Sequence, residues 1–474
     1  MQELAEFERY LEHLKGAVGH ADRQAGLRGY CTGLMSSAKR KSVEPMAGLI
    51  DPNNTRSKHQ SLHHFVADSA WSDEQMLLRV AQWVVPEMDF SDGGWWIVDD
   101  TGFPKAGQHS VGVARQYCGM LGKQDNCQVA VSVSLACAQA SLPVAWRLYL
   151  PEPWAGDKAR RAKAGVPEEI EFATKPTIAL GQIKHLIEQG APKHCVLSDA
   201  GYGVDTAFRQ GLSELGLQYI VGITGAITVW APGHEPLPSA AQSGKGRSQR
   251  MRIGPINDPQ HRPQAAKQVA LALSPLEWCR VSWREGTQQT LRSRFARLRV
   301  RAAHRDECRT ELRAPEWLLI EWPEDEPEPT KYWLSTRPKS VSVQRLVYEA
   351  KMRWRIERDY QDLKQDLGLG HYEGRGWRGF HHHASLSIAS YGFLTVLRLK
   401  HPDEIAGKKN AAFREEPALP THYRPRGSPA HAAPRPLVDN ELTAAYRSRL
   451  ALNPSQMPLL SSAQRKTQYL TQYD

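Results

Sequence analysis

The chain lacks long apolar runs and paired cysteines, and each absence excludes a class of protein. No stretch approaches about 18 uncharged apolar residues, so we expect no membrane-spanning helix. The N-terminal segment MQELAEFERYLEHLKG predicts an amphipathic helix and has no apolar core of the kind found in signal peptides. The seven cysteines are scattered and include no CxxC pair, which predicts reduced thiols in a cytoplasmic protein without a zinc site.

Nucleotide-binding motifs and internal repeats are also missing. The sequence contains neither the GxGxxG pattern of dinucleotide-binding domains nor a P-loop, which argues against a metabolic enzyme. What it does contain is an excess of positive charge, with 61 Lys and Arg against 51 Asp and Glu and a net charge of +10. Nucleic acid is the commonest polyanionic partner of such a chain.

The 474 residues are enough for several domains, and the sequence pattern changes along them. Helical periodicity near 3–17 and 73–86 dominates the start, while short strands and helices alternate further on. We expect a helical DNA-binding or dimerisation domain (1–90), the first part of an α/β core (91–216), a β-rich insertion (217–340), the rest of the core (341–400), and a Pro/Arg-rich linker with a C-terminal tail (401–474).

The first strand expected in the core ends in two carboxylates. The apolar run Trp95–Val98 leads into Asp99 and Asp100, and a turn is expected at Thr101–Lys105. An antiparallel meander should follow, with strands at 111–117, 128–138 and 141–151. Side chains at the carboxyl ends of strands are common site residues in α/β sheets, although a lone aspartate there is more often a cap or a turn residue.

A second apolar run ends in the same way. His194–Ser198 leads into Asp199, and a glycine-containing segment and a helix at 204–215 follow. Helices are also expected near 157–164 and 176–189. A strand that ends in Asp and then Gly commonly presents its side chain at the carboxyl edge of a sheet, where the sites of α/β proteins lie.

A third acidic residue lies on an expected helix that begins after Ser340 or Ser342 and ends at Gly368. Its apolar stripe is formed by Ile356, Tyr360, Leu363 and Leu367. Arg353, Glu357 and Lys364 follow at intervals of four and seven, which places them on nearly one face. Taken alone, this spacing is also typical of an ordinary surface ion pair.

Together, the three acids suggest a site for divalent metal ions. Asp99, Asp199 and Glu357 offer hard oxygen ligands, which suit Mg²⁺ or Mn²⁺ rather than zinc or copper. Two such ions, held roughly 3.5–4 Å apart, can activate a nucleophilic oxygen and stabilise the leaving oxygen of a phosphodiester. The sequence therefore predicts a two-metal phosphoryl-transfer site on a nucleic-acid-binding protein.

The same three blocks resemble bacterial insertion-sequence transposases of the DDE type, which belong to the RNase H-like (retroviral-integrase) superfamily. Asp99-Asp100-Thr101 is similar to the family's Asp-x-Thr/Ser, and VLSDAGYG is similar to the block around its second aspartate. The third block of the family has Tyr, then Arg three residues on, Glu four further and Lys seven further. Arg353, Glu357 and Lys364 match this pattern, while Ala350 departs from it, with Tyr348 two residues earlier.

The resemblance covers about 90–395 and implies a fold and an activity. The fold would be a mixed sheet flanked by helices, with a β-rich insertion before the catalytic Glu. The activity would be cleavage of element ends and joining of their 3′-OH groups to target DNA, with two Mg²⁺ or Mn²⁺ ions on Asp99, Asp199 and Glu357. Arg353, Lys364 and Lys105 would contact DNA phosphates. A homodimer on paired ends and a location near the nucleoid are also implied.

Several alternatives remain open at this stage. Asp100 could replace Asp99 as the first ligand, although the family pattern selects Asp99. The resemblance implies a tryptophan that stacks on a flipped base, for which Trp230, Trp283 and Trp333 are candidates; each is more often a core residue. The run His381–His383 is expected to be exposed or to face DNA. An RNase H-like nuclease without strand transfer, or a non-catalytic DNA-binding derivative, would share the same features.

Overall fold

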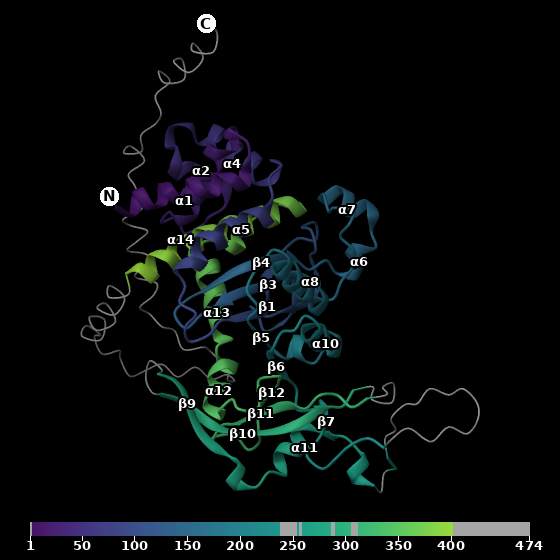
Figure 1. Ribbon diagram of the computed structural model, residues 1–474. Helices are drawn as coiled ribbons and strands as arrows, with labels where there is room; N and C mark the ends of the chain where they lie inside the picture. The colour runs from purple at the N-terminus through teal and green to yellow at the C-terminus, as the bar shows by residue number, and fades with distance from the viewer. Residues whose placement is uncertain (1, 238–253, 256–257, 286–289, 305–310, 402–474) are drawn as a thin grey trace, which may run out of the picture.

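The structure is a computed structural model that describes residues 2–237, 254–255, 258–285, 290–304 and 311–401. Within these residues a twelve-stranded mixed sheet runs through the molecule, with helices packed against it (Figure 1). The strands of its core are β1 (Trp95–Pro104), β2 (Ala114–Cys118), β3 (Lys123–Ala136), β4 (Ser141–Leu148), β5 (Cys195–Ser198) and β6 (Tyr219–Ile223). The expected mixed α/β architecture with an N-terminal helical region is confirmed.

β1 lies at the centre of this core. It pairs in parallel with β5, from Trp95 beside Cys195 to Val98 beside Ser198, and antiparallel with β3 along its whole length. The antiparallel pairing continues to Pro104, so the turn expected at Thr101–Lys105 was wrong. The glycine and proline there suggested a turn, but the long partner strand β3 holds the segment extended.

Both faces of the core sheet are covered, as the apolar strand sequences require. Its helices are α6 (Glu152–Ala155), α7 (Lys158–Ala164), α8 (Lys175–Glu188), α9 (Ala200–Gly203) and α10 (Thr206–Glu214). The short helix α9 follows β5 and packs directly on β6. A Cβ atom on Gly203 would lie 1.9 Å from the carbonyl oxygen of Gly222, so this close approach requires glycine.

The segment expected to form a β-rich insertion extends the same sheet. It contains β7 (Thr228–Trp230), β8 (Gln264–Ala265), α11 (Ala266–Leu271), β9 (Cys279–Glu285), β10 (Thr290–Ala302), β11 (Glu316–Trp322) and β12 (Lys331–Ser335). β12 pairs antiparallel with β6, and β6 pairs in parallel with β5. The first strand that we assigned to the insertion, β6, therefore lies between the core strands and the rest of the insertion.

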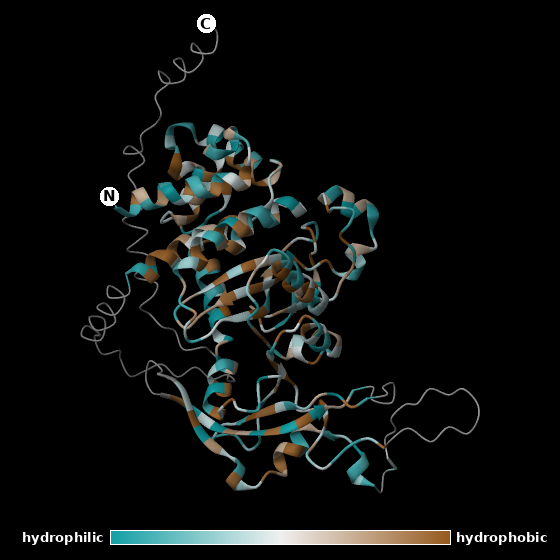
Figure 2. Ribbon diagram, viewed as in Figure 1, coloured by the Kyte–Doolittle hydropathy of each residue, from teal (hydrophilic) through white to brown (hydrophobic). Residues whose placement is uncertain are grey.

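Five helices precede the sheet, namely α1 (Gln2–Val18), α2 (Gln24–Met35), α3 (Val43–Ile50), α4 (Thr55–Ala67) and α5 (Asp73–Val84). α1, α2, α4 and α5 pack on α14 (Trp377–Lys400), which itself packs on β4, and α5 also contacts β4 directly (Figure 1). α14 is buried from Trp377 to Leu397 except at Arg378, and Figure 2 shows many apolar residues along it. A helix contacted on all sides needs no polar face. No helix in the described residues is both long and apolar enough to cross a bilayer.

The expectation that His381–His383 is exposed was wrong, because this run lies in the buried part of α14. His381 and His383 are 5% and 1% exposed. The His381 Nε2 accepts from the Leu148 N–H at 3.1 Å, and its Nδ1 lies 2.9 Å from the Trp377 carbonyl. His383 lies between the Tyr30 hydroxyl and the Gly368 carbonyl, at 2.9 Å from each. These rings therefore join the N-terminal helices to the sheet and to the end of the preceding helical segment.

The helix expected to run unbroken to Gly368 is divided. α12 (Val343–Lys351) starts at Ser342, whose side chain accepts from the Arg345 N–H, and α13 (Trp354–Gln361) follows after a break. A π-helical turn, Asp362–Asp366, continues α13 towards Gly368. The apolar periodicity continues across the break, so the sequence pattern could not reveal it. α12 contacts the insertion strands β9 and β10, whereas α13 contacts β1 and β4.

Candidate active site

Asp99 and Asp199 lie side by side because their strands are parallel and in register. The pairing of Val98 with Ser198 places each aspartate one residue further along its strand. Asp199 also caps α9, since its Oδ1 accepts from the Gly201 N–H at 2.9 Å. The two carboxylates therefore lie where the β1–β5 pairing ends. The sequence had suggested that Asp99 ends its strand, but β1 continues to Pro104, so Asp99 lies within the strand.

Arg353 connects the third acid to this edge. Its Nη1 donates to Asp99 Oδ2 at 2.8 Å, and its Nη2 donates to Glu357 Oε1 at 2.5 Å. Arg353 lies in the break just before α13, and Glu357 follows one turn later. Burial lowers the pKa of Arg353, but the charges of Asp99, Glu357 and Asp199 outweigh this effect and raise it above its usual value. One guanidinium thus lies within the field of all three acids.

Asp99 is the most perturbed of these carboxylates. Its side chain is 15% exposed, and burial raises its pKa to about 7. Arg353 lowers this pKa, whereas the neighbouring charges of Asp199 and Asp100 raise it further. Because the charged form of Asp99 is disfavoured by burial and by like charges, an additional cation at this edge would be favourable.

Asp100 points to the opposite face of the sheet, as the alternation along a strand requires. Its Oδ2 accepts from Lys175 Nζ on α8 at 2.9 Å and from the Tyr202 hydroxyl at 3.3 Å. The described contacts therefore place Asp99, and not Asp100, on the side of the sheet that faces Arg353 and Glu357. This arrangement is consistent with Asp99, the residue that the family pattern selects, as the first ligand.

Residues 10–290, more than half of the chain, match the DDE superfamily endonuclease family. The chain belongs to this family. The matched region contains Asp99 and Asp199 and ends before α12 and α13. A curated relative is the probable transposase for insertion sequence element IS701 of Microchaete diplosiphon, which is 34% identical over 192 residues. That match covers 40% of this chain and 46% of the relative, so it spans about half of the relative's length.

The donor chemistry of this DDE endonuclease suits a hard divalent cation, because the three acids supply only carboxylate oxygens. In their present arrangement, no three His, Cys, Asp or Glu side chains among the described residues are grouped to hold one ion. The guanidinium of Arg353 contacts Asp99 and Glu357 at once. Glu357 is 52% exposed, which leaves its carboxylate room to change rotamer.

Buried polar contacts that sequence reasoning missed hold α13 on the sheet. Asp359 Oδ1 accepts from the hydroxyl groups of Ser141 on β4 and Tyr391 on α14, at 2.5 and 2.8 Å. The hydroxyls of Tyr360 and Ser132 lie 2.8 Å apart, and Ser132 is the residue of β3 opposite Asp99. Asp359 looked like one more surface charge in a strongly charged helix, so only its neighbours in the fold reveal its role.

The two lysines that we predicted to bind DNA lie further along the same segments. Lys364, in the π-helical turn, donates to the Gly102 carbonyl at 2.9 Å. Lys105 donates to the Tyr372 carbonyl at 2.8 Å. Burial lowers the pKa of Lys364 to about 8 and lowers that of Lys105 as well. In the described residues neither amine pairs with Asp99, Asp199 or Glu357.

Two of the three candidate tryptophans surround a lysine of α12. The Nζ of Lys351 lies 4.3 Å from the ring centre of Trp283 and 5.4 Å from that of Trp333. The same amine donates to both carboxylate oxygens of Glu321, at 2.7 and 2.6 Å. Trp230 and Trp333 are 2% and 8% exposed, whereas Trp283 is partly exposed. Lys351 thus joins the insertion to the chain just before Arg353.

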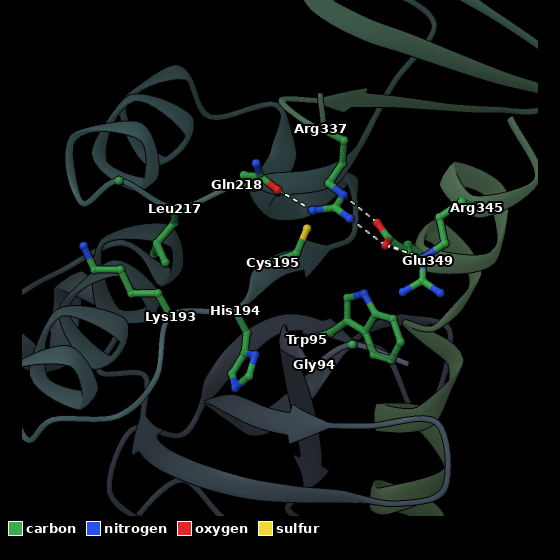
Figure 3. Close-up of a pocket in the computed structure, with 12 residues that line it drawn as sticks. Gly94, Trp95, Lys193, His194, Cys195, Leu217, Gln218, Arg337, Arg345 and Glu349 are labelled. Carbon is green, nitrogen blue, oxygen red and sulfur yellow. Dashed lines mark hydrogen bonds and ion pairs between the residues drawn. The ribbon is translucent and has the colours of Figure 1, made fainter. Parts of the chain in front are cut away.

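A second acid–arginine cluster lies at the other end of β1 and β5, around a cavity of about 360 Å³ (Figure 3). Arg337 contacts both carboxylate oxygens of Glu349, at 2.9 and 2.8 Å, and Arg345 Nε donates to Glu349 at 2.7 Å. Arg345 also donates to Asp92 at 2.6 Å. The cluster fixes α12 to the start of the core strands.

Proposed function

We propose that this DDE endonuclease is a DNA transposase that cuts the ends of an insertion sequence and joins their 3′-OH groups to target DNA. The observation that carries the proposal is the contact of Arg353 with both Asp99 and Glu357, within the field of Asp199. This contact joins two acids that lie far apart in the sequence, and the charge of Asp199 acts on the same guanidinium. Family membership and the similarity to a probable transposase support the same activity.

In this proposal, Asp99, Asp199 and Glu357 would hold two Mg²⁺ or Mn²⁺ ions. When bound, such ions activate the attacking oxygen and neutralise charge on the scissile phosphate. The strands β1 and β5 hold the two aspartates in fixed positions, and the exposed Glu357 reaches the DNA side of the site. Arg353 would orient Asp99 and Glu357, and its positive charge would also attract the DNA phosphate that binds at the site.

Further contacts with DNA would come from basic residues beyond the acids. Lys364 and Lys105 are held at fixed positions by backbone carbonyls, so their amines can meet phosphates on either side of the cut. We propose residues 1–90 as the DNA-binding or dimerisation domain, and a homodimer as the species that pairs two element ends. The partly exposed Trp283 is the candidate for stacking on a displaced base.

The test uses purified protein and labelled DNA from the regions that flank its gene. With Mg²⁺, we expect nicks at the element boundary and, with a supercoiled target plasmid, joined products. Glu357→Gln should abolish both products, whereas Glu373→Gln, a change at an exposed glutamate paired with Arg40, should retain them. Cleavage retained by Glu357→Gln would contradict the site assignment.

Two alternatives give different products in the same assay. Nicks without joined products would indicate an RNase H-like nuclease that does not transfer strands. Binding without nicks, together with no Mn²⁺ binding that depends on the three acids, would indicate a non-catalytic DNA-binding protein. The presence of all three acids argues against the non-catalytic protein, and the joined products separate the transposase from the nuclease.

A further inference from the structure

The hairpin between β2 and β3 carries an exposed apolar tip. Tyr117, Met120 and Leu121 are 59%, 56% and 40% exposed, and they lie within five consecutive residues. Elsewhere in the described residues, large apolar side chains with comparable exposure occur singly, apart from the pair Leu271 and Leu276. Large apolar side chains gathered at one exposed point usually mark a binding surface.

The surroundings of this tip are basic and close to the proposed site. Arg115 and Lys123, both exposed, lie on the two strands of the hairpin. The Nζ of Lys364 lies 3.8 Å from the sulfur of Met120 while it donates to the carbonyl of Gly102. Gly102 is three residues beyond Asp99 on β1. The tip therefore projects beside an amine that faces DNA in the proposed function.

We propose that the tip formed by Tyr117, Met120 and Leu121 is a wedge that packs against the nucleobases next to the cut phosphate and unstacks them. The inference rests on the proposed function, since it concerns DNA held at the same site. Apolar side chains inserted between base steps, with cations on the flanking phosphates, are a known way of deforming a duplex. Bases also stack on exposed aromatic rings such as that of Tyr117.

The charge around the tip favours DNA over a protein partner. Arg115 and Lys123 lie on the two strands that lead to the tip, and Lys364 contacts Met120. The acid Asp125 is paired with Lys123 at 3.2 Å. A second copy of the chain would bring the same cations against themselves, which costs binding energy, whereas phosphates on both sides of a base step complement them. The small area of three side chains also suits a wedge better than a stable dimer interface.

The test places 2-aminopurine, whose fluorescence rises when it is unstacked, at successive positions of duplexes made from the gene-flanking DNA. The wedge variant is Met120→Ser with Leu121→Ser. The matched control is Leu271→Ser with Leu276→Ser, a pair on the insertion that is 51% and 96% exposed. All four side chains are exposed, so both variants should fold, and thermal unfolding checks this.

With wild-type protein and the control, we expect fluorescence to rise at one or two positions beside the cut. The wedge variant should bind the duplex with a similar dependence on salt, because its phosphate contacts remain. Its fluorescence rise should be lost, because nothing then offsets the cost of unstacking the base step. Its cleavage rate should fall about tenfold, which corresponds to about 1.4 kcal/mol of activation free energy. Mismatched bases at the same positions should restore cleavage by the wedge variant.

An unchanged fluorescence rise in the wedge variant would overturn the inference, as would an equal loss in the control. A change in oligomeric state of the wedge variant, with normal fluorescence, would assign the tip to a second copy of the chain. These outcomes differ from a failure of the proposed function. In that case wild-type protein would cleave neither the paired nor the mismatched duplex, and the fluorescence comparison would still decide whether the tip unstacks bases.

Discussion

The two ends of the β1–β5 strand pair each carry carboxylates held by arginine, but the balance of charge differs. At the amino end, two carboxylates, Glu349 and Asp92, meet two arginines, and Glu349 is only 1% exposed. At the carboxyl end, three acids share the field of Arg353, and Glu357 is 52% exposed. The first cluster is closed and compensated, whereas the second has an excess of negative charge that faces outward.

This difference separates a structural cluster from a candidate catalytic one without reference to the sequence motif. A buried carboxylate such as Glu349 is stable only when cations and hydrogen bonds satisfy it, and removing either partner is costly. Like charges such as Asp99 and Asp199 are held close only when the fold fixes them there. Burial, together with the nearby charges of Asp199 and Asp100, raises the pKa of Asp99 to about 7. Additional cations would therefore stabilise the carboxylates at the carboxyl end, whereas the carboxylates at the amino end are already neutralised by Arg337 and Arg345.

The largest effects are expected when one carboxylate at each end of the β1–β5 pair is replaced by its amide. Asp99→Asn should reduce Mg²⁺-dependent cleavage by about 10³-fold, because several kcal/mol of charge stabilisation at the phosphate are lost. Its stability should be unchanged or higher, since a crowded carboxylate is removed. Glu349→Gln should instead lower the free energy of unfolding by about 3 kcal/mol, because Arg337 and Arg345 lose their shared partner. Cleavage assays and urea unfolding measure the two effects.

The distinction between the two clusters fails if Asp99→Asn and Glu349→Gln change cleavage activity and the free energy of unfolding in the same way. An Asp99→Asn protein that unfolds as easily as Glu349→Gln would make the carboxyl-end cluster structural. Asp100→Asn is the matched control, because this side chain faces Lys175 on the opposite side of β1. It should retain most of the cleavage activity.

A smaller effect is expected from Arg353, which orients two of the acids. Arg353→Gln should reduce kcat by about 10²-fold, because Asp99 and Glu357 lose a charged two-point contact and the phosphate loses a cation. Arg353→Lys keeps the charge but cannot reach both carboxylates in the same geometry, so it should recover only part of the rate. Single-turnover cleavage with each variant measures this. Full activity of Arg353→Lys would show that charge alone matters.

Local patterns in the sequence placed Asp99 and Asp199 directly after two apolar runs, but they did not show that these runs pair. The parallel pairing of β1 with β5 and the continuation of β1 to Pro104 depend on strands that are distant in the sequence. The break before α13 could not be predicted, because it depends on the docking of α12 and α13 on different parts of the sheet. The burial of His381–His383 was missed for a similar reason, since the backbone groups that satisfy these rings belong to distant segments. Contacts between distant segments leave no local periodicity.

The smallest effect concerns two lysines whose pKa is lowered to about 8 by burial. Lys351 is neutralised by Glu321. Among the described residues, the printed contacts of the Lys364 amine are the carbonyl of Gly102, the sulfur of Met120 and the ring of Phe103, with the Cys118 thiol nearby and no carboxylate. Only protonated Lys364 attracts a phosphate. Affinity for DNA should therefore be highest below about pH 8 and fall as the pH rises through it, by roughly fivefold to tenfold for one charged hydrogen bond.

Titrations of labelled duplex without divalent ions, between about pH 7 and 9.5, measure this dependence directly, because they span the lowered pKa of Lys364 and stop short of the usual lysine value. Lys364→Arg should bind equally well across the range, since a guanidinium stays protonated. A residual slope in that variant would come from Lys105, whose pKa burial also lowers, and Lys105→Arg would remove it. Equal slopes in wild type and in Lys364→Arg would show that this amine does not meet a phosphate.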